Sequence, residues 1–144
     1  MKTIVPFFVA LIATHNRPAL LAKRALSSIA AQQRRPDLIV VADDSDPCFR
    51  THNKKTVETF AVQTNVESLY IDNGRCQGAS GAWNSGALEV LGMDSLPSAE
   101  DIYLAILDDD DEWFPWHLAN AETVVQTDVK KRADVLMAAF ARRE

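Results

Sequence analysis

The sequence predicts an α/β fold, in which a mostly parallel sheet carries helices on both faces. Short apolar runs that suit buried strands alternate along the whole chain with segments of helical periodicity. The 144 residues suffice for one domain with a proper core, and 47% hydrophobic with 24% charged residues is an ordinary globular composition. No internal repeat, linker or low-complexity stretch divides the chain. We therefore expect a single domain over residues 1–144.

Each apolar run predicts one strand of the sheet. Residues 7–13 and 102–107 are apolar on both faces, as strands inside a parallel sheet are. The five strands are expected at 7–13, 38–42, 68–71, 102–107 and 133–140. Each strand is followed by a break in the apolar pattern, which places a helix or a loop between it and the next strand.

Helical patterns fill the segments between these strands. Pro18 suits the first turn of a helix, Leu21, Ala25 and Ile29 are spaced for one apolar face, and Pro36 ends the pattern. Further helices are expected at 56–62, 82–91 and 115–127. The alternation of strands and helices implies a Rossmann-like sheet with helices on both faces.

The charge balance argues against two kinds of partner. The formal net charge is -5, from 15 basic and 20 acidic side chains, and the basic residues form no cluster. Nucleic acid and anionic membrane surfaces both attract concentrated positive charge. No segment approaches the roughly 20 apolar residues of a transmembrane helix. The apolar run 4–13 lacks the cleavage site of a signal peptide and fits a buried strand.

The cysteines and histidines predict neither a disulfide nor a zinc site. Cys48 and Cys76 lie far apart and form no CxxC pair, which favours two reduced thiols in a cytoplasmic protein. His15, His52 and His117 lack the spacing of zinc ligands.

Polar clusters follow three of the predicted strands, at the points where those strands end. They are 14–17 (Thr-His-Asn-Arg), 43–46 (Asp-Asp-Ser-Asp) and 108–111 (four Asp). The carboxyl ends of parallel strands meet at one edge of a sheet, and ligands of open α/β sheets bind outside that edge. We therefore expect the three clusters to form one binding site.

The run of four aspartates predicts a divalent cation site. Adjacent carboxylates repel one another and raise each other's pKa, so four of them at the end of a buried strand do not stabilise the fold. Hard oxygen ligands suit Mg²⁺ or Mn²⁺, and substrate phosphates commonly complete the coordination shell. The alternative is a solvated acidic turn. The position of the run, after a buried strand and opposite a second acidic strand end, favours the metal.

The second acidic cluster predicts contacts with a nucleoside. A carboxylate here can accept a hydrogen bond from a base N–H or a ribose hydroxyl, as acidic residues do in other nucleotide-binding folds. We favour this function for Asp44, whereas Asp46 fits equally well as a turn or helix cap before Pro47. The glycines spell neither GxGxxG nor a Walker loop, so a dinucleotide site or a P-loop is not predicted. The loop 72–80 would instead allow a ligand to approach the backbone.

Taken together, these motifs resemble the N-terminal half of family 2 glycosyltransferases, which have the GT-A fold. The matching stretches are 13–18 (ATHNRP), 41–46 (VADDSD), 81–86 (GAWNSG) and 107–115 (LDDDDEWFP). They occur in the family's order and cover nearly the whole chain.

The resemblance implies an inverting transfer of sugar from a nucleotide-diphosphate donor, typically a UDP-sugar, with Mn²⁺ or Mg²⁺ as cofactor. Asp44 would bind the base, Asn84 would lie on the ribose and phosphate side, and Asp108 with Asp110 would form the Asp-x-Asp motif. The implied donor site comprises Thr14, His15, Asn16, Arg17, Asp43, Asp44, Gly81, Asn84, Asp108 and Asp109, and the implied metal site Asp108, Asp110 and Asp111. The resemblance also implies a cytoplasmic protein, peripheral at the inner membrane face.

The sequence departs from the family pattern in two respects. Many members carry an Arg that holds phosphate where this chain has Trp83, and Arg75 or Arg17 are the candidates to replace it. The family's catalytic base lies in a C-terminal acceptor-binding half, so we name no catalytic base and expect residues 1–144 to be a partial domain. The acceptor is not predicted.

Two other functions compete with this interpretation. A chain of this length would also serve as a nucleotide-sugar-binding module without turnover. A phosphoacceptor signalling domain is likewise doubly wound and uses clustered aspartates with Mg²⁺. Its acidic pair follows the first strand, however, whereas the pairs here follow the second and fourth, which argues against it.

Overall fold

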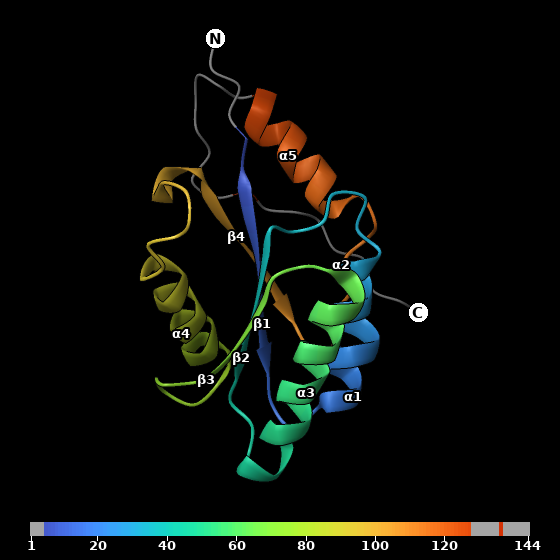
Figure 1. The fold of residues 1–144 in the computed structure, drawn as a ribbon, viewed down its shortest axis with the longest axis vertical. Helices are drawn as coiled ribbons and strands as arrows, with labels where there is room; N and C mark the ends of the chain where they lie inside the picture. The colour runs from blue at the N-terminus through green and yellow to red at the C-terminus, as the bar shows by residue number, and fades with distance from the viewer. Residues whose placement is uncertain (1–4, 128–135, 137–144) are drawn as a thin grey trace.

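Parallel strands form the centre of the molecule in the computed structural model, which describes residues 5–127 and 136 (Figure 1). The described part contains a four-stranded sheet in the order β3-β2-β1-β4. The strands are β1 (Phe7–Thr14), β2 (Leu38–Asp43), β3 (Ser68–Asp72) and β4 (Ile102–Asp108), and each neighbouring pair is parallel. The predicted α/β fold with a mostly parallel sheet is thus confirmed.

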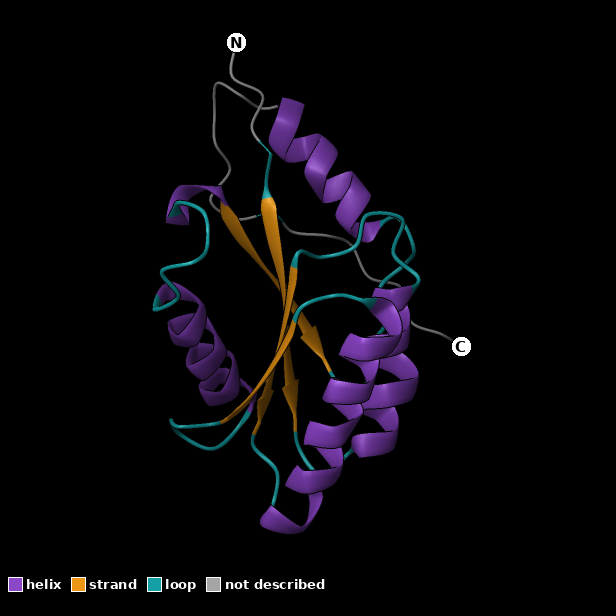
Figure 2. Ribbon diagram, in the orientation of Figure 1, coloured by secondary structure: helices purple, strands orange, loops and turns teal. Residues whose placement is uncertain are grey.

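Helices connect the strands and cover both faces of the sheet, as Figure 2 shows. They are α1 (Pro18–Leu20), the π-helical η1 (Leu21–Leu26), α2 (Ser27–Ala30), α3 (Pro47–Thr64), α4 (Ala79–Leu91), the 3-10 helix η2 (Ala99–Asp101) and α5 (His117–Thr127). The first three follow one another without a break and are called here the first helix. In Figure 1, α4 lies on one side of the sheet, and the first helix and α3 lie on the other.

The central strands are buried because both of their faces are covered. Val9 and Leu11 of β1 belong to an apolar cluster with Val90 of α4. Ala10 and Ile12 point to the opposite face and pack with residues of the first helix and α3. Burying each large aliphatic side chain stabilises the fold by roughly 1.5–3 kcal/mol. Two apolar layers therefore explain why β1 and β2 are continuous apolar runs.

The strand register brings polar residues to one edge of the sheet. Thr14 pairs with Asp43, and Asp43 in turn pairs with Asp72. Asp108, the last residue of β4, lies opposite Ala13. The four strands therefore end at nearly the same level, and the polar clusters that follow β1, β2 and β4 converge there as predicted.

Several element boundaries differ from the sequence prediction. The helix expected at 56–62 extends over Pro47–Thr64, because Pro47 opens it directly after Asp46 and Asn65 ends it in a left-handed conformation. The helix expected from 82 begins at Ala79. The last helix begins at His117, after a turn at 115–116, and not at Pro115.

Two further predictions concern the ends of the chain and its relation to membranes. The fifth strand, expected at 133–140, falls outside the described residues except for Leu136. None of the helices within residues 5–127 combines the length and the apolar character that crossing a bilayer requires.

Candidate functional site

Three aspartates gather their carboxylates at the end of β4. One oxygen atom each from Asp108, Asp110 and Asp111 lies within 4.8 Å of the others. A tight turn makes this possible, because the Asp111 N–H donates to the Asp108 carbonyl at 3.2 Å. These are the three residues that the sequence predicted as metal ligands.

The carboxylate cluster fits a divalent cation in charge, size and ligand type. With metal–oxygen distances of about 2.1 Å, two ligands of one Mg²⁺ ion are at most about 4.2 Å apart, so a small closing movement of the side chains suffices. Burial, followed by the nearby charges of Asp110, Asp111 and Asp109, raises the pKa of Asp108. The raised pKa means that the ionised form of Asp108 is disfavoured without a cation. A divalent ion would remove this penalty.

Asp109, in the middle of the run, points in the opposite direction and is fully buried. Strand side chains alternate, so Asp109 continues the inward side of buried Leu107. Its Oδ2 accepts hydrogen bonds from the Thr14 hydroxyl at 2.8 Å and the His15 N–H at 3.3 Å. Its Oδ1 pairs with Arg17 Nη2 at 2.7 Å. Burial raises the pKa of Asp109, and these partners oppose that shift. Asp109 thus anchors the end of β1 to the end of β4.

Asp43 is a second buried anchor, at the end of β2. Its Oδ1 accepts the Ser45 N–H at 2.8 Å, and its Oδ2 accepts from Asn53 Nδ2 at 2.8 Å and from the Tyr70 hydroxyl at 2.7 Å. Burial, and then the hydrogen bond to Asp43, raises the pKa of Tyr70, so the phenol keeps its proton and donates. These hydrogen bonds make Asp43 an anchor for the end of β2, and the donor contact expected for it stays a prediction.

Asp44 holds the loop that precedes α4. Its Oδ1 accepts from Asn73 Nδ2 at 2.8 Å, and its Oδ2 accepts the Gly78 N–H at 2.7 Å. The Asn73 amide oxygen in turn accepts from the Ser85 hydroxyl of α4 at 2.8 Å. The loop is therefore tied at one end to β2 and at the other to α4. Gly78 has φ 114°, a conformation that favours glycine.

Asn16 connects the loops that follow β1 and β2. Its side-chain amide donates to Asp46 Oδ2 and accepts the Asp46 N–H, both at 2.8 Å, while its own N–H donates to Ser45 Oγ at 2.8 Å. His15 Nδ1 lies 2.8 Å from the Asp44 carbonyl and donates to it, which leaves Nε2 free on an exposed ring. These contacts fix the first polar cluster against the second.

A cavity of about 260 Å³ lies between the ends of β1 and β4 and the start of α4. Its lining residues come from four segments: Ala13, Thr14, His15, Arg17, Asp44, Gln77, Gly78, Ala79, Ala82 and Asp108. Arg17 is the one permanent cation among them, and Asp108 connects the cavity to the carboxylate cluster. The cavity offers a positive charge, carboxylates and the N-terminus of a helix, which together suit a phosphorylated ligand with a metal.

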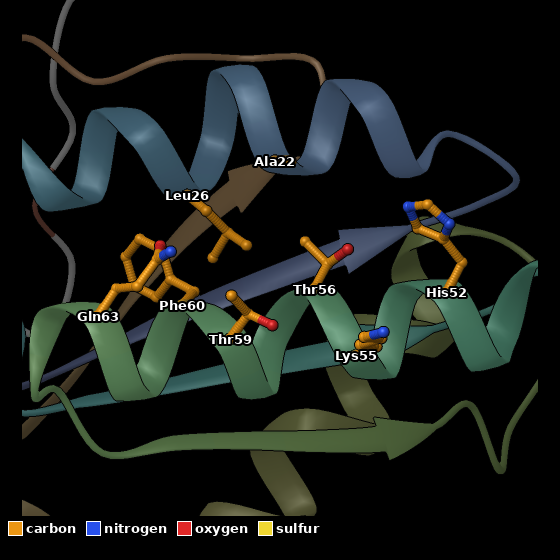
Figure 3. Close-up of a pocket in the computed structure, with 8 residues that line it drawn as sticks. All are labelled: Ala22, Leu26, His52, Lys55, Thr56, Thr59, Phe60 and Gln63. Atoms are coloured by element: carbon orange, nitrogen blue, oxygen red, sulfur yellow. The ribbon is translucent and has the colours of Figure 1, made fainter.

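A larger cavity, of about 460 Å³, lies between the first helix and α3 (Figure 3). Figure 3 shows Leu26 and Phe60 at its base and polar side chains such as Lys55 and Thr56 along α3. It contains none of the predicted site residues and no carboxylate lines it. The smaller cavity at the strand ends is therefore the better candidate site.

Replacing Gly81 with alanine is expected to weaken ligand binding at the smaller cavity by tenfold or more, a loss of at least about 1.4 kcal/mol. An added Cβ would overlap with the Cys76 carbonyl oxygen, so the loop at 73–78 must move away from α4. Calorimetric titration with nucleotide would measure the affinity, and a thermal melt would measure how far the displaced loop affects stability. Gly74→Ala is the matched control, since no atom lies within 4 Å of the Cβ it would add. Equal binding by the two variants would contradict the prediction.

Comparison with known proteins identifies the family. The model of the glycosyl transferase family 2 domain matches residues 9–139. The chain belongs to glycosyltransferase family 2. It is 35% identical, over 102 residues, to the galactofuranosyltransferase GlfT1 of Mycolicibacterium smegmatis, a match that covers 70% of this chain and 29% of the relative.

Solved structures support the fold of this family 2 glycosyltransferase chain. The crystal structure of S. aureus TarS matches with a TM-score of 0.59 and 21% identity, covering 83% of this chain and 19% of TarS. The structure of S. aureus TarS 1-349 matches with a TM-score of 0.60 and 19% identity, covering 83% and 32%. The predicted GT-A type of α/β fold is thereby confirmed. The chain spans less than a third of the length of these relatives.

The structure separates the predicted site residues of the family 2 chain into four groups. Thr14, His15, Arg17, Asp44 and Asp108 line the cavity, and Asp108, Asp110 and Asp111 form the carboxylate cluster. Asn16, Asp43 and Asp109 bond to protein groups around the cavity, and Gly81 allows the loop to pack on α4. Asn84 is exposed on α4 and is not among the lining residues.

Sequence reasoning missed several residues that build the site. Asn73, Gln77 and Gly78 form one wall of the cavity or tie it to Asp44. Arg24 donates to the Asp110 carbonyl at 2.9 Å. The sequence predicts that the loop 72–80 lets a ligand approach the backbone, but no sequence pattern specifies which side chain bonds to Asp44.

Proposed function

We propose that this chain is the donor- and metal-binding part of an inverting glycosyltransferase that uses a nucleotide-diphosphate sugar, with UDP as the nucleotide. One observation carries the proposal: the cluster of Asp108, Asp110 and Asp111 borders a cavity that is also lined by the Arg17 side chain and the N-terminus of α4. The family to which the chain belongs supports the same activity. The acceptor remains unspecified, and no residue of this chain is proposed as the catalytic base.

Asp108, Asp110 and Asp111 would hold Mn²⁺ or Mg²⁺. When bound, such an ion offsets the negative charge that develops on the departing nucleotide diphosphate. The chain's own residues do the remaining work. Arg17 would offer its guanidinium to the phosphates, and the N-terminus of α4, whose Ala79 also lines the cavity, would add the positive end of a helix dipole.

Thr14, His15 and Asp44, which all line the cavity, would contact the nucleoside. His15 Nε2 is the free acceptor there, because Nδ1 is bonded to the Asp44 carbonyl. We leave Asp43 and Asp109 out of the donor contacts, because neither lines the cavity and both are buried and bonded to protein groups. We also propose that the chain works in the cytoplasm, where the exposed thiols of Cys48 and Cys76 stay reduced.

Calorimetric titration with UDP, with and without Mn²⁺, tests this proposal. Wild type is expected to bind UDP in a manganese-dependent way, with GDP and dTDP binding more weakly. Asp110→Ala is expected to lose the manganese dependence, because it removes one of the three clustered carboxylates. Asp94→Ala is the control, since Asp94 is an exposed aspartate after α4.

The outcomes of this titration separate the competing functions. Binding of no nucleotide by a chain with a cooperative thermal melt would overturn the proposal. Binding that persists unchanged in Asp110→Ala would overturn the metal site. Nucleotide binding by the longest natural chain, without turnover of any UDP-sugar, would favour a binding module over an enzyme.

A further inference from the structure

Two arginines, one just before the first helix and one within it, hold a single residue of the carboxylate cluster. Arg17 Nη1 donates to Asp110 Oδ2 at 2.7 Å, and Arg24 Nη1 donates to the Asp110 main-chain carbonyl at 2.9 Å. One arginine therefore fixes the side chain and the other fixes the backbone. The two contacts reach across more than 80 residues of sequence.

The other two clustered aspartates are held by the sheet and by the turn that follows it. Asp108 pairs with Ala13 in the register of β4 on β1. Asp111 follows from Asp108, because its N–H donates to the Asp108 carbonyl. Asp110 lies beyond the last pair of the ladder, and its side chain is 40% exposed. Its position therefore depends on the two arginines more than on the sheet.

Arg24 extends from a rigid base. It lies in the π-helical stretch η1, whose Leu21, Ala25 and Leu26 are buried in the core. π-Helical turns inside helices occur frequently at functional sites. Arg17, in contrast, also pairs with the buried carboxylate of Asp109, so it contributes to the fold as well. Arg24 donates to a main-chain carbonyl and forms no ion pair within the part of the chain that the structure describes, which makes it the cleaner residue to test.

We propose that Arg24, together with Arg17, is a positioning residue that sets the direction of the Asp110 carboxylate within the metal site. This inference rests on the proposed function, because it takes the cluster to be a metal site. Outer partners that orient a ligand typically change metal affinity 10–100-fold when they are replaced. Arg24 would act in this way through the backbone of Asp110.

The test compares Arg24→Lys and Arg24→Met with wild type for Mn²⁺ affinity, measured by electron paramagnetic resonance without nucleotide. Both variants are expected to bind Mn²⁺ at least tenfold more weakly. The Mn²⁺ spectrum should also change, because the coordination of Asp110 is altered. Thermal melts without metal should coincide with wild type, since Arg24 is exposed. Lys23→Met is the matched control, because it removes an exposed charge from the same helix.

The lysine variant distinguishes positioning from charge. If Arg24 acted only as a nearby positive charge, Arg24→Lys would bind like wild type and Arg24→Met would bind Mn²⁺ more tightly. That result, or unchanged affinity in both variants, would overturn the inference while leaving the proposed function intact. Absence of Mn²⁺ binding by wild type itself would instead overturn the proposed function, and this inference with it.

Discussion

Asp43→Ala is expected to destabilise the fold by about 3–5 kcal/mol, because two buried donors and one half-buried donor lose their acceptor and each costs about 1–3 kcal/mol, the half-buried one least. Those donors are the Ser45 N–H, the Asn53 amide and the Tyr70 hydroxyl. Asp43 is fully buried, so water cannot replace the lost carboxylate without opening the end of β2. Urea denaturation followed by circular dichroism would measure the change.

Asp72→Ala is the matched control for that experiment. Asp72 pairs with Asp43 in the sheet register, but its side chain is 59% exposed and lies 3.7 Å from Arg50. An exposed ion pair of this kind is worth about 0–1 kcal/mol. If Asp43→Ala lost no more stability than Asp72→Ala, the hydrogen bonds to Asp43 would not be what holds the end of β2.

Asp108→Asn and Asp109→Ala are expected to have opposite effects on stability, although the two aspartates are adjacent. Asp109→Ala removes the acceptor of Thr14 and His15 and the partner of Arg17, which should cost about 2–4 kcal/mol. Asp108→Asn removes one charge from a repelling cluster and should raise stability without metal. The same change should weaken Mn²⁺ binding at least about 100-fold, since a proposed ligand is lost.

Thermal melts at several pH values, with and without Mn²⁺, would test this contrast. The pKa of Asp108 is raised in the folded chain, so the neutral carboxyl is the form that the fold favours. The related stabilisation is complete below the unfolded pKa of about 3.9 and is lost as pH rises through the raised folded value. Metal-free wild type should therefore gain stability on mild acidification, and Asp108→Asn should gain less. Mn²⁺ should shift the pH dependence the opposite way, because it binds the ionised form.

Asp94→Asn provides the control for a general effect of charge, since it removes an exposed carboxylate after α4. The chain has a formal net charge of -5, so the loss of any negative charge has a small favourable effect. If Asp108→Asn and Asp94→Asn raised metal-free stability equally, repulsion within the cluster would not be the cause.

The fold could be predicted because its signal is local. Strands with two apolar faces are continuous apolar runs, and the sequence predicts β1, β2 and β4 on that basis. Within the described residues, β1 and β2 are buried on both faces, whereas β4 lies at the edge of the sheet with Leu104 and Ile106 exposed, which differs from the burial expected for 102–107. The start of α3 could not be placed in the same way. Its residues 50–55 are polar and lie mostly towards solvent, so no apolar period marks the start of the helix.

The sequence predicted which segments meet at the site, because the strand topology determines that, but it did not predict the side-chain contacts within the site. Parallel strands bring their ends together, which is why the clusters at 14–17, 43–46 and 108–111 were expected to meet. The division of the aspartates into buried anchors and cavity residues depends on side-chain direction at each strand end. The contact of Arg24 with Asp110 depends on the placement of a π-helical turn, for which the sequence carries no recognised pattern.

The alternating directions of β4 have a consequence for the four identical residues that follow. Ile106 is exposed and Leu107 is buried, and Asp108 and Asp109 continue the same alternation into the acidic run. The alternation of side-chain directions along the strand thus decides which carboxylate is a buried anchor and which faces the cavity. A single-residue insertion within β4 would leave the sequence of the acidic run unchanged but would reverse the directions of the Asp108 and Asp109 side chains. The role of each aspartate is therefore set by the number of residues that separate it from the start of β4.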